Sequence, residues 1–453
     1  MSFLKRLFHS WSSDRLLGRI VKNSGLLFTS NTISAILSIV TANLLGVEKF
    51  GALGIVISFV SSINRLLSFR MADVVVRYMG EYVTRGELKK AGALVKAAGL
   101  MEAGTSLAAY LVLVLAAPLG ARYIAHDPSS TPYFFLFGIS IIGMLATETA
   151  TGVLQVGNRF KGQSVINLLQ SLVTAVIIVY AYFTKAGILV VLLAYLAGKL
   201  VAGIGPILLA IRNLNQTLGK GWWQASFKLL PPFKELARFA ISTNLSGTIN
   251  MVVRDSELLW VGWLFNTQAA GYYKTALAVI NLMIMPINPF ISTTYPEIMR
   301  SIIQKAWQRL RQLLRRVTLI ASGWTLAVGI VLVLFGRQLF FTAWIPWNGE
   351  LHTIYKSEFL PALPLLIILL AGFGLANSLY WNRSLLLAFG MADYPLKVAF
   401  WATLVKVALT VTVVPLLGYQ WEAVLLSLYL CVTVAILARK GLSEISKKEG
   451  EAV

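Results

Sequence analysis

The groups that build metal centres and disulfide bonds are almost absent from this sequence. Its 453 residues include one cysteine, Cys431, and three widely spaced histidines, His9, His126 and His352. One cysteine cannot form an intrachain disulfide, and these histidines do not have the spacing of a zinc site. The Gly-x-x-x-x-Gly-Lys-Ser/Thr motif of nucleotide-hydrolysing loops is also missing. We therefore expect no metal, no bound cofactor and no enzymatic activity.

Charged residues are scarce as well. They make up 13% of the chain, against about 25% in soluble proteins, while apolar residues make up 57% and the mean hydropathy is +0.72. This composition is typical of a polytopic membrane protein. Acidic residues are the scarcer charged group, with 19 Asp and Glu against 40 Lys and Arg. Nucleic-acid binding would need a basic soluble domain, which the sequence lacks, so we assign the excess of positive charge to cytoplasmic loops.

Long apolar segments predict twelve membrane-spanning helices, most of them near the 20 or so residues that cross a bilayer. They lie at residues 24–45, 51–70, 91–117, 133–155, 164–184, 187–211, 236–264, 271–294, 316–336, 360–385, 395–416 and 419–438. The predicted fold is an all-α polytopic membrane protein with two six-helix bundles, residues 23–212 and 236–440. Basic amphipathic segments at 1–22 and 213–235 are expected on the membrane surface, and 441–453 is a predicted cytoplasmic tail.

The distribution of positive charge predicts the orientation of these helices. With the N-terminus inside, 24 Lys and Arg fall in cytoplasmic segments and 5 in outer segments. Such an asymmetry is typical of the cytoplasmic side of a membrane protein. We therefore expect both termini to be cytoplasmic in a prokaryotic inner membrane, with loops 118–132 and 337–359 outside.

Two stretches of the sequence resemble each other at an offset of about half the chain. Each joins apolar spans through a short polar turn with a glycine beside an aromatic residue, Phe50-Gly51 in one and Gly271-Tyr272 in the other. The basic residues Arg85, Lys89 and Lys96 have counterparts at the same offset, Lys305, Arg309 and Arg316. Because each half contains an even number of predicted spans, the halves should point the same way, related by an axis along the membrane normal.

Several short motifs are similar to those of a known family. They are Leu44-Leu45-Gly46-x-x-x-Phe50-Gly51, Leu154-Gln155-x-Gly157-x-x-Phe160, Arg254-Asp255-x-Glu257-Leu258, Ala270-Gly271-Tyr272-Tyr273 and Phe359-Leu360-Pro361-Ala362-Leu363-Pro364. Across residues 20–440 the chain resembles the polysaccharide-transporter (oligosaccharide flippase) family of the multidrug/oligosaccharidyl-lipid/polysaccharide exporter superfamily. The resemblance implies two bundles around a V-shaped, alternately opening cavity. It also implies an undecaprenyl-pyrophosphate-linked oligosaccharide as cargo, and a polysaccharide polymerase or glycosyltransferases as partners.

Charged residues inside apolar spans mark the candidate substrate site. A charge at the centre of a membrane helix costs about 2.5–3.5 kcal/mol, so it should face protein or a water-filled cavity. A cationic lining suits a pyrophosphate and repels a cationic drug. The alternative is that each cation pairs with a fixed carboxylate, as Arg254 could with Glu257. The candidate substrate-binding residues are Arg65, Lys96, Lys199, Arg254, Lys274 and Lys406.

Acidic residues inside the spans are candidates for ion coupling. A carboxylate in the membrane can bind a proton or Na⁺ and exchange it as the conformation changes. The alternative is again a fixed ion pair, above all between Asp255 and Arg254. The candidate coupling residues are Asp255, Glu257, Glu148 and Glu102.

Three functions remain open from the sequence. The favoured one is a flippase that moves the lipid-linked oligosaccharide from the inner to the outer leaflet by alternating access. The second is an ion-coupled multidrug or metabolite antiporter of the same superfamily. The third is a non-transporting scaffold in glycan assembly, which would gain nothing from the cost of inserting charges.

Overall fold

The computed structural model describes residues 15–69, 71–230, 255–343, 345–347, 350–391 and 393–450, and they divide into two units. The N-terminal unit contains residues 36–271 and the C-terminal unit contains residues up to 35 together with those from 272 onward. The chain passes between the units twice, within helix α2 (Arg15–Leu67) and within helix α11 (Thr267–Ile284).

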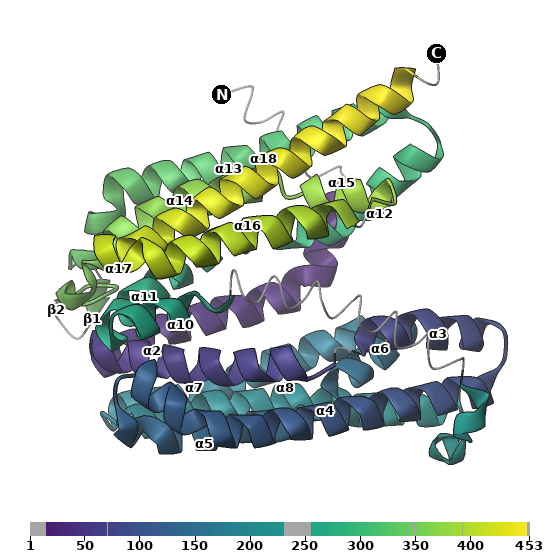
Figure 1. Ribbon diagram of the computed structural model, residues 1–453, viewed down its shortest axis with the longest axis horizontal. Coiled ribbons are helices and arrows are strands. Elements are labelled where there is room, and N and C mark those ends of the chain that lie inside the picture. Colours follow the sequence, from purple (N-terminus) through teal and green to yellow (C-terminus); the bar gives the residue numbers. More distant parts are fainter. Residues whose placement is uncertain are drawn as a thin grey trace. The chain divides into compact units, whose positions relative to one another are not determined.

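The N-terminal unit is helical throughout its described part (Figure 1). Besides its share of α2 and α11, it contains α3 (Ala72–Thr84), α4 (Leu88–Tyr123), η1 (Pro128–Ser130), α5 (Thr131–Gly143), α6 (Thr147–Val156), α7 (Phe160–Phe183), α8 (Ile188–Thr217), η2 (Trp222–Gln224), η3 (Phe227–Leu229) and α10 (Glu257–Leu264).

Helix α2 joins two segments that the sequence predicted as separate spans, 24–45 and 51–70. The expected break is reduced to a kink at Gly46, whose φ of 75° and ψ of 170° are not helical. Only glycine adopts this backbone conformation easily, because it has no Cβ. The prediction of a turn over residues 46–50 was therefore wrong, since the helix resumes directly after one glycine.

Small residues allow the long helices of the N-terminal unit to pack closely. Helix α8 lies against α5, α6 and α7. A Cβ added at Gly203 would lie 2.3 Å from the carbonyl oxygen of Gly143 on α5, and one at Gly198 would lie 2.2 Å from the hydroxyl of Thr174 on α7. Membrane helices associate through such close backbone approaches, because burial of apolar side chains from lipid contributes little.

The two copies of the repeated glycine motif pack against each other within the N-terminal unit. A Cβ at Gly51 of α2 would lie 1.8 Å from the carbonyl oxygen of Thr267, and one at Gly271 of α11 would lie 2.2 Å from that of Val47. The glycines that marked the repeat in the sequence are therefore the residues at which the two helices that link the units cross.

The C-terminal unit contains the remaining elements, with one short β-hairpin among its helices. They are α12 (Asn288–Ile303), α13 (Trp307–Phe341), β1 (Ile345–Trp347), β2 (Glu350–His352), η5 (Ser357–Phe359), α14 (Ala362–Ser378), α15 (Asn382–Ala388), α16 (Asp393–Thr412), α17 (Val414–Leu417) and α18 (Gln420–Gly450). Helix α14 packs between α13 and α18, and α16 packs on α18.

The hairpin lies in the predicted outer loop 337–359, where no strand was predicted. Its register pairs Ile345 with His352 and Trp347 with Glu350. After the hairpin, the chain is held to the end of α13 by a hydrogen bond of 2.8 Å, which the Tyr355 N–H donates to the Phe340 carbonyl. Tyr355 is buried among aromatic rings that include Phe359, and this burial raises the pKa of its hydroxyl.

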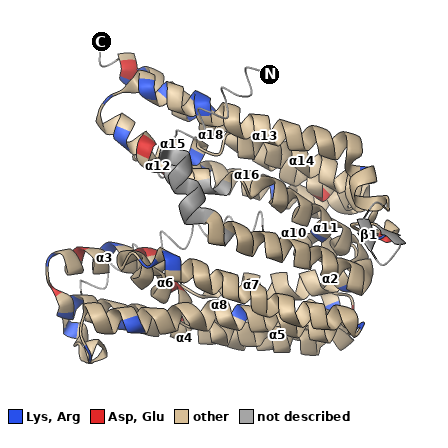
Figure 2. Cartoon of the chain, turned by 180° about the vertical axis from the view of Figure 1, so that it is seen from behind, with Lys and Arg blue, Asp and Glu red and all other residues tan. Residues whose placement is uncertain are grey.

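The predicted class, an all-α polytopic membrane protein, is confirmed. Within the part of the chain that the structure describes, nine helices are long and apolar enough to cross a membrane. They cover ten of the twelve predicted spans, because α2 contains two of them. The predicted span 236–264 falls largely outside the described residues, and 271–294 corresponds to α11 and the start of α12. In Figure 2, most Lys and Arg of each unit lie near helix ends, and tan residues cover the helix lengths between.

The predicted bundles and the observed units share most of their residues but differ at their ends. Residues 23–35, expected in the first bundle, group with the C-terminal unit, and residues 255–271, expected in the second, group with the N-terminal unit. The predicted N-terminal segment and much of the predicted linker lie outside the described residues. The predicted domain boundaries therefore stay a prediction.

Cysteine labelling tests the predicted orientation. In a variant whose native Cys431 is replaced by Ala, a cysteine at Ser129 or Lys356 should react with an impermeant maleimide in intact cells. Both residues are exposed and lie in the predicted outer loops. A cysteine at the exposed Lys220 or Lys305 should react only after permeabilisation. Labelling of Lys220→Cys in sealed cells would reverse the assignment.

Candidate functional site

A polar cavity of about 330 Å³ lies among the helices of the N-terminal unit. At about 30 Å³ each, this volume holds on the order of ten water molecules. Its charged lining residues come from five separate parts of the chain, Arg65 of α2, Glu102 of α4, Glu148 of α6, Lys199 of α8 and Asp255 before α10. These five are predicted site residues, and the structure brings them together.

Arg65 and Asp255 form an ion pair across the cavity wall. Arg65 occupies the last turn of α2, where the partial negative charge of the helix C-terminus favours a cation. Both side chains remain about half exposed, at 56% and 47%, so the pair contributes little stability and can open. From the sequence, the expected partner of Asp255 was its neighbour Arg254, which lies outside the described residues. The observed partner, Arg65, is 190 positions away in the chain and was not predicted.

Glu102 holds the start of α6. Its two carboxylate oxygens accept hydrogen bonds from the backbone N–H groups of Glu148, at 2.9 Å, and Thr149, at 2.8 Å. Glu102 is 1% exposed. Because the first N–H groups of a helix have no partner within it, a buried carboxylate at this place satisfies two of them. This geometry gives Glu102 a structural role that the sequence did not indicate.

Among the described residues that line the cavity, Lys199 is the cation without a fixed acidic partner. It lies eleven residues into the 30-residue helix α8, about 17 Å along the axis and so near the middle of the membrane. In the described part of the chain, no ion pair joins its ammonium to a carboxylate. Asn64 lines the same cavity, and its buried side-chain oxygen has no hydrogen-bond partner. The cavity therefore offers one donor group and one acceptor to a ligand or to water.

The charges of the described cavity do not show the predicted excess of cations. Two cations, Arg65 and Lys199, face three carboxylates. Asp255 is paired with Arg65, and Glu102 is occupied by the N-terminus of α6. The described lining is therefore mixed in charge instead of cationic.

Lys96 lies away from the cavity, contrary to its predicted place in a common lining. Its ammonium donates a hydrogen bond of 2.9 Å to the carbonyl of Ala225 and lies 4.1 Å from the ring centre of Phe227. Lys96 thus attaches the segment after α8 to helix α4. Lys96 was predicted to lie within the span 91–117, because apolar residues of α4 continue on both sides of it.

Lys406 pairs with the carboxylate of Glu422, which was not among the predicted site residues. Its ammonium lies 2.5 Å from Glu422, whose second oxygen accepts a hydrogen bond of 2.9 Å from Thr410. The Lys406 and Glu422 side chains are 2% and 0% exposed. The two residues lie on α16 and α18, which only the short helix α17 separates along the chain, so the adjacency of the last two predicted spans was the signal for this pair. The expectation of an unpaired Lys406 was wrong.

The two remaining described candidates lie at other places in the fold. Lys274 is half-buried in the part of α11 that belongs to the C-terminal unit. Glu257 is fully buried in the first turn of α10. A carboxylate there is favoured by the helix N-terminus.

Comparison with known proteins agrees with this architecture. The family of polysaccharide biosynthesis proteins matches residues 20–302. The inner membrane protein YghQ of Escherichia coli (strain K12) is 24% identical over 336 residues, which cover 73% of this chain and 93% of that protein.

Solved structures share the fold at low sequence identity. An inward-facing multidrug resistance MATE transporter of the MOP superfamily matches with a TM-score of 0.72 and 13% identity, covering 94% of this chain and 96% of its own. The lipid II flippase MurJ in an inward closed conformation matches with a TM-score of 0.69 and 13% identity, covering 95% of this chain and 90% of its own. These matches confirm the resemblance drawn from the sequence motifs. The chain belongs to the family of polysaccharide biosynthesis proteins and shares the fold of the MATE transporter and of MurJ.

Proposed function

We propose that this protein is a flippase, without enzymatic activity, for an undecaprenyl-pyrophosphate-linked oligosaccharide. It moves the cargo from the inner to the outer leaflet of the prokaryotic inner membrane by alternating access, with both of its termini in the cytoplasm. Membership in the polysaccharide biosynthesis family and the fold shared with a lipid II flippase support this assignment. A polysaccharide polymerase or glycosyltransferases would supply and consume the cargo.

Lys199 is the observation that carries the proposal. An ammonium near mid-membrane without a fixed carboxylate is costly unless a mobile anion or water neutralises it. A pyrophosphate that passes through the N-terminal unit would meet Lys199, and also Arg65 if its half-exposed pair with Asp255 opens. Charge-assisted hydrogen bonds to phosphate oxygens are about twice as strong as neutral ones.

Ion coupling in this proposal falls to Glu148 and Asp255. Both carboxylates line the cavity, and the half-exposed Asp255 is within reach of water. Protonation or Na⁺ binding at Asp255 would release Arg65 to an anionic cargo, which links the ion to the cargo without a further cofactor. Glu102 and Glu257 are weaker candidates, because each lies buried at a helix N-terminus.

Substitution of Lys199 tests the cargo assignment. In proteoliposomes with a fluorescent polyprenyl-pyrophosphate oligosaccharide, Lys199→Ala should lower the flipping rate at subsaturating cargo by about 10–100-fold. This range corresponds to the loss of one hydrogen bond to a charged group, about 1.5–3 kcal/mol. Lys199→Arg should keep part of the rate, because it keeps the charge.

The exposed Lys220 provides a matched control, since Lys220→Ala removes the same charge outside the cavity and should leave the rate unchanged. Unchanged flipping by Lys199→Ala would refute the role of Lys199.

The mixed charge of the cavity favours one second candidate, an ion-coupled antiporter for cationic drugs or metabolites. Its cargo would bind Glu148, and Glu148→Gln would abolish efflux of a cationic dye driven by a proton or Na⁺ gradient. Dye efflux that is sensitive to Glu148→Gln, combined with no flipping, would replace the flippase assignment by the antiporter.

A further inference from the structure

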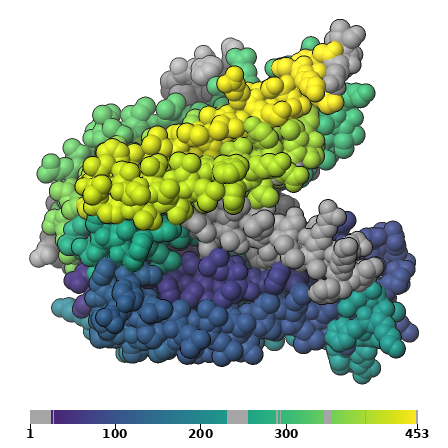
Figure 3. Space-filling model, viewed as in Figure 1, coloured from purple at the N-terminus to yellow at the C-terminus, as the bar shows by residue number. Residues whose placement is uncertain are grey.

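Helices α13 and α18 continue past their apolar segments as a joint extension. We call this extension the basic stem and define it as residues 307–316 of α13 and residues 439–450 of α18. In the space-filling view of Figure 3, the last turns of α18, in yellow, lie at the surface of the C-terminal unit. The charge distribution along the sequence places the stem on the predicted cytoplasmic side.

The basic stem has its own packed interior. Buried apolar residues from four helices meet at its base, among them Ile298 of α12, Leu310 of α13, Leu385 of α15 and Ile445 of α18. Gly441 permits this packing, because a Cβ there would lie 2.7 Å from Leu385. A membrane protein needs only positive charge in its cytoplasmic loops to set its orientation. It does not need a folded extension to carry that charge.

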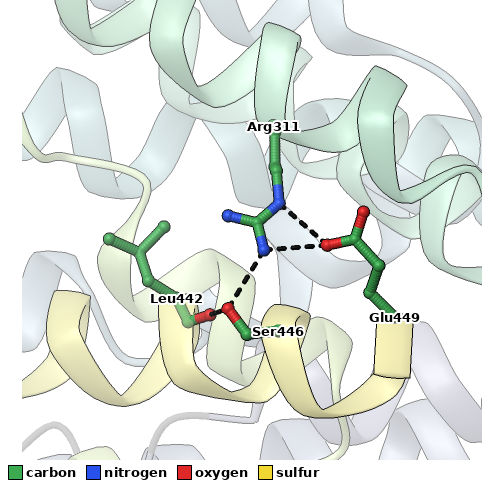
Figure 4. A network of polar contacts seen from close by, with 4 residues as sticks. All are labelled: Arg311, Leu442, Ser446 and Glu449. Atoms are coloured by element: carbon green, nitrogen blue, oxygen red, sulfur yellow. Dashed lines mark hydrogen bonds and ion pairs between the residues drawn. The ribbon is translucent and has the colours of Figure 1, made fainter. Parts of the chain in front are cut away.

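A network of polar contacts fastens the two helices of the stem together (Figure 4). The Nε and Nη2 groups of Arg311 donate to one carboxylate oxygen of Glu449 at 3.1 and 2.9 Å, and Nη2 also donates to the hydroxyl of Ser446 at 3.0 Å. In addition, Lys440 pairs with Glu444 at 2.7 Å along α18. The stem's two carboxylates are thus already engaged by its own cations.

The charge of the stem and the adjoining end of α12 has one dominant sign. Residues 297–316 and 439–450 contain ten Lys and Arg but three Glu. The third carboxylate, Glu297, contacts Arg300 and Arg309. Single-sign surfaces of this kind attract partners of opposite charge and raise their association rate.

The length of the stem favours a soluble partner over lipid headgroups. Ten residues of α13 and twelve of α18 extend about 15 and 18 Å along the helix axes. The headgroup region adds only about 5–8 Å to each side of the hydrocarbon core. At physiological salt the Debye length is about 8 Å, so the field of anionic lipids is weak at the end of the stem.

Ile303 adds an apolar contact at this end. It is the last residue of α12, 73% exposed, and lies between Arg300 and Lys305 in the sequence. An exposed large aliphatic side chain with cations near it is typical of the centre of a protein interface with a charged rim.

We propose that the end of the basic stem, with Ile303 and the cations near it, docks an acidic, partly apolar segment of a cytoplasmic protein. The docking surface belongs to the C-terminal unit alone, and the choice of a glycan-assembling partner rests on the proposed function. A glycan-assembling enzyme with an acidic, leucine-containing tail would fit the surface. Docking there would bring the producer of a membrane-bound cargo to its transporter.

The test uses the full chain in nanodiscs of phosphatidylcholine and two fluorescent 20-residue probes. One probe repeats Glu-Leu-Glu-Glu and the other repeats Glu-Ser-Glu-Glu. Both should bind, the leucine probe more tightly. The triple variant Lys305→Gln, Arg309→Gln and Lys447→Gln should weaken binding of both probes by about tenfold, because three exposed charge contacts are lost. Ile303→Ser should weaken only the leucine probe, by about threefold to tenfold.

A matched triple variant of the N-terminal unit provides the control. Lys89→Gln, Arg212→Gln and Lys220→Gln remove three exposed cations from predicted cytoplasmic segments and should change binding by less than twofold. Equal weakening by both triples would show attraction by net charge only and overturn the docking site. Loss of probe binding in nanodiscs that contain phosphatidylglycerol would assign the surface to lipid headgroups, which also overturns it.

Discussion

Replacing Lys406 by Met alone is expected to lower the free energy of unfolding by about 3–5 kcal/mol, because it leaves Glu422 as an uncompensated buried charge. Glu422→Gln alone should have an effect of similar size, since Lys406 then loses its counter-charge. The combined variant Lys406→Met with Glu422→Met should recover most of the loss, because well-packed apolar residues often replace a buried pair without cost. Thermal unfolding in detergent, followed by tryptophan fluorescence, measures all three.

An exposed pair on the same helix is the control for this experiment. Lys440 and Glu444 lie 2.7 Å apart, one turn from each other on α18, with side chains 33% and 16% exposed. Lys440→Met should lower the free energy of unfolding far less than Lys406→Met, since water solvates the remaining carboxylate. If Lys406→Met were equally mild, Glu422 would have to be neutral in the native protein and the ion pair would be absent.

The same variants separate stability from transport. If the double variant Lys406→Met with Glu422→Met is stable and still transports, the role of the ion pair is to hold α16 against α18. A stable double variant without transport would show that the charges themselves take part in the transport cycle, as membrane-buried ionisable groups commonly do.

Gly51→Ala is expected to be the most disruptive of the glycine substitutions, and Gly271→Ala nearly as damaging. The added methyl groups would lie 1.8 Å from the carbonyl oxygen of Thr267 and 2.2 Å from that of Val47. Both obstacles are backbone atoms, so neither can move aside as a flexible side chain does. We expect a loss of more than about 3 kcal/mol, beyond the usual cost of overpacking. Size-exclusion chromatography of detergent-solubilised protein should show little folded material.

Gly104 and Gly323 serve as controls, because an added Cβ would meet nothing within 4 Å at either position. Alanine in these helices should be neutral or stabilising by up to about 1 kcal/mol, as expected from its higher helix propensity. A well-folded Gly51→Ala protein would mean that α2 and α11 do not cross at this distance in the native molecule.

Hydropathy and charge along the chain were sufficient for the class of the fold. Transfer of apolar segments into lipid depends on the composition of each segment, so spans such as those of α7, α8 and α14 follow from about 20 consecutive residues. The same reasoning predicted that Arg65, Glu102, Glu148, Lys199 and Asp255 would face protein or water, and all five line one cavity. Short motifs around Gly51 and Gly271 were sufficient for the family.

The order of residues along the chain was enough to place charges within apolar spans, but the contacts of each charge depend on how the helices pack. Ion pairs form between atoms a few ångströms apart, whatever their separation in the chain, as in Arg65 with Asp255 and Lys406 with Glu422. Local reasoning therefore paired Asp255 with its neighbour Arg254 and left Lys406 without a partner. Glu102 is a weaker candidate for ion coupling, because its carboxylate accepts hydrogen bonds from the start of α6. Burial of a segment is a property of its composition, whereas pairing is a property of how the segments pack.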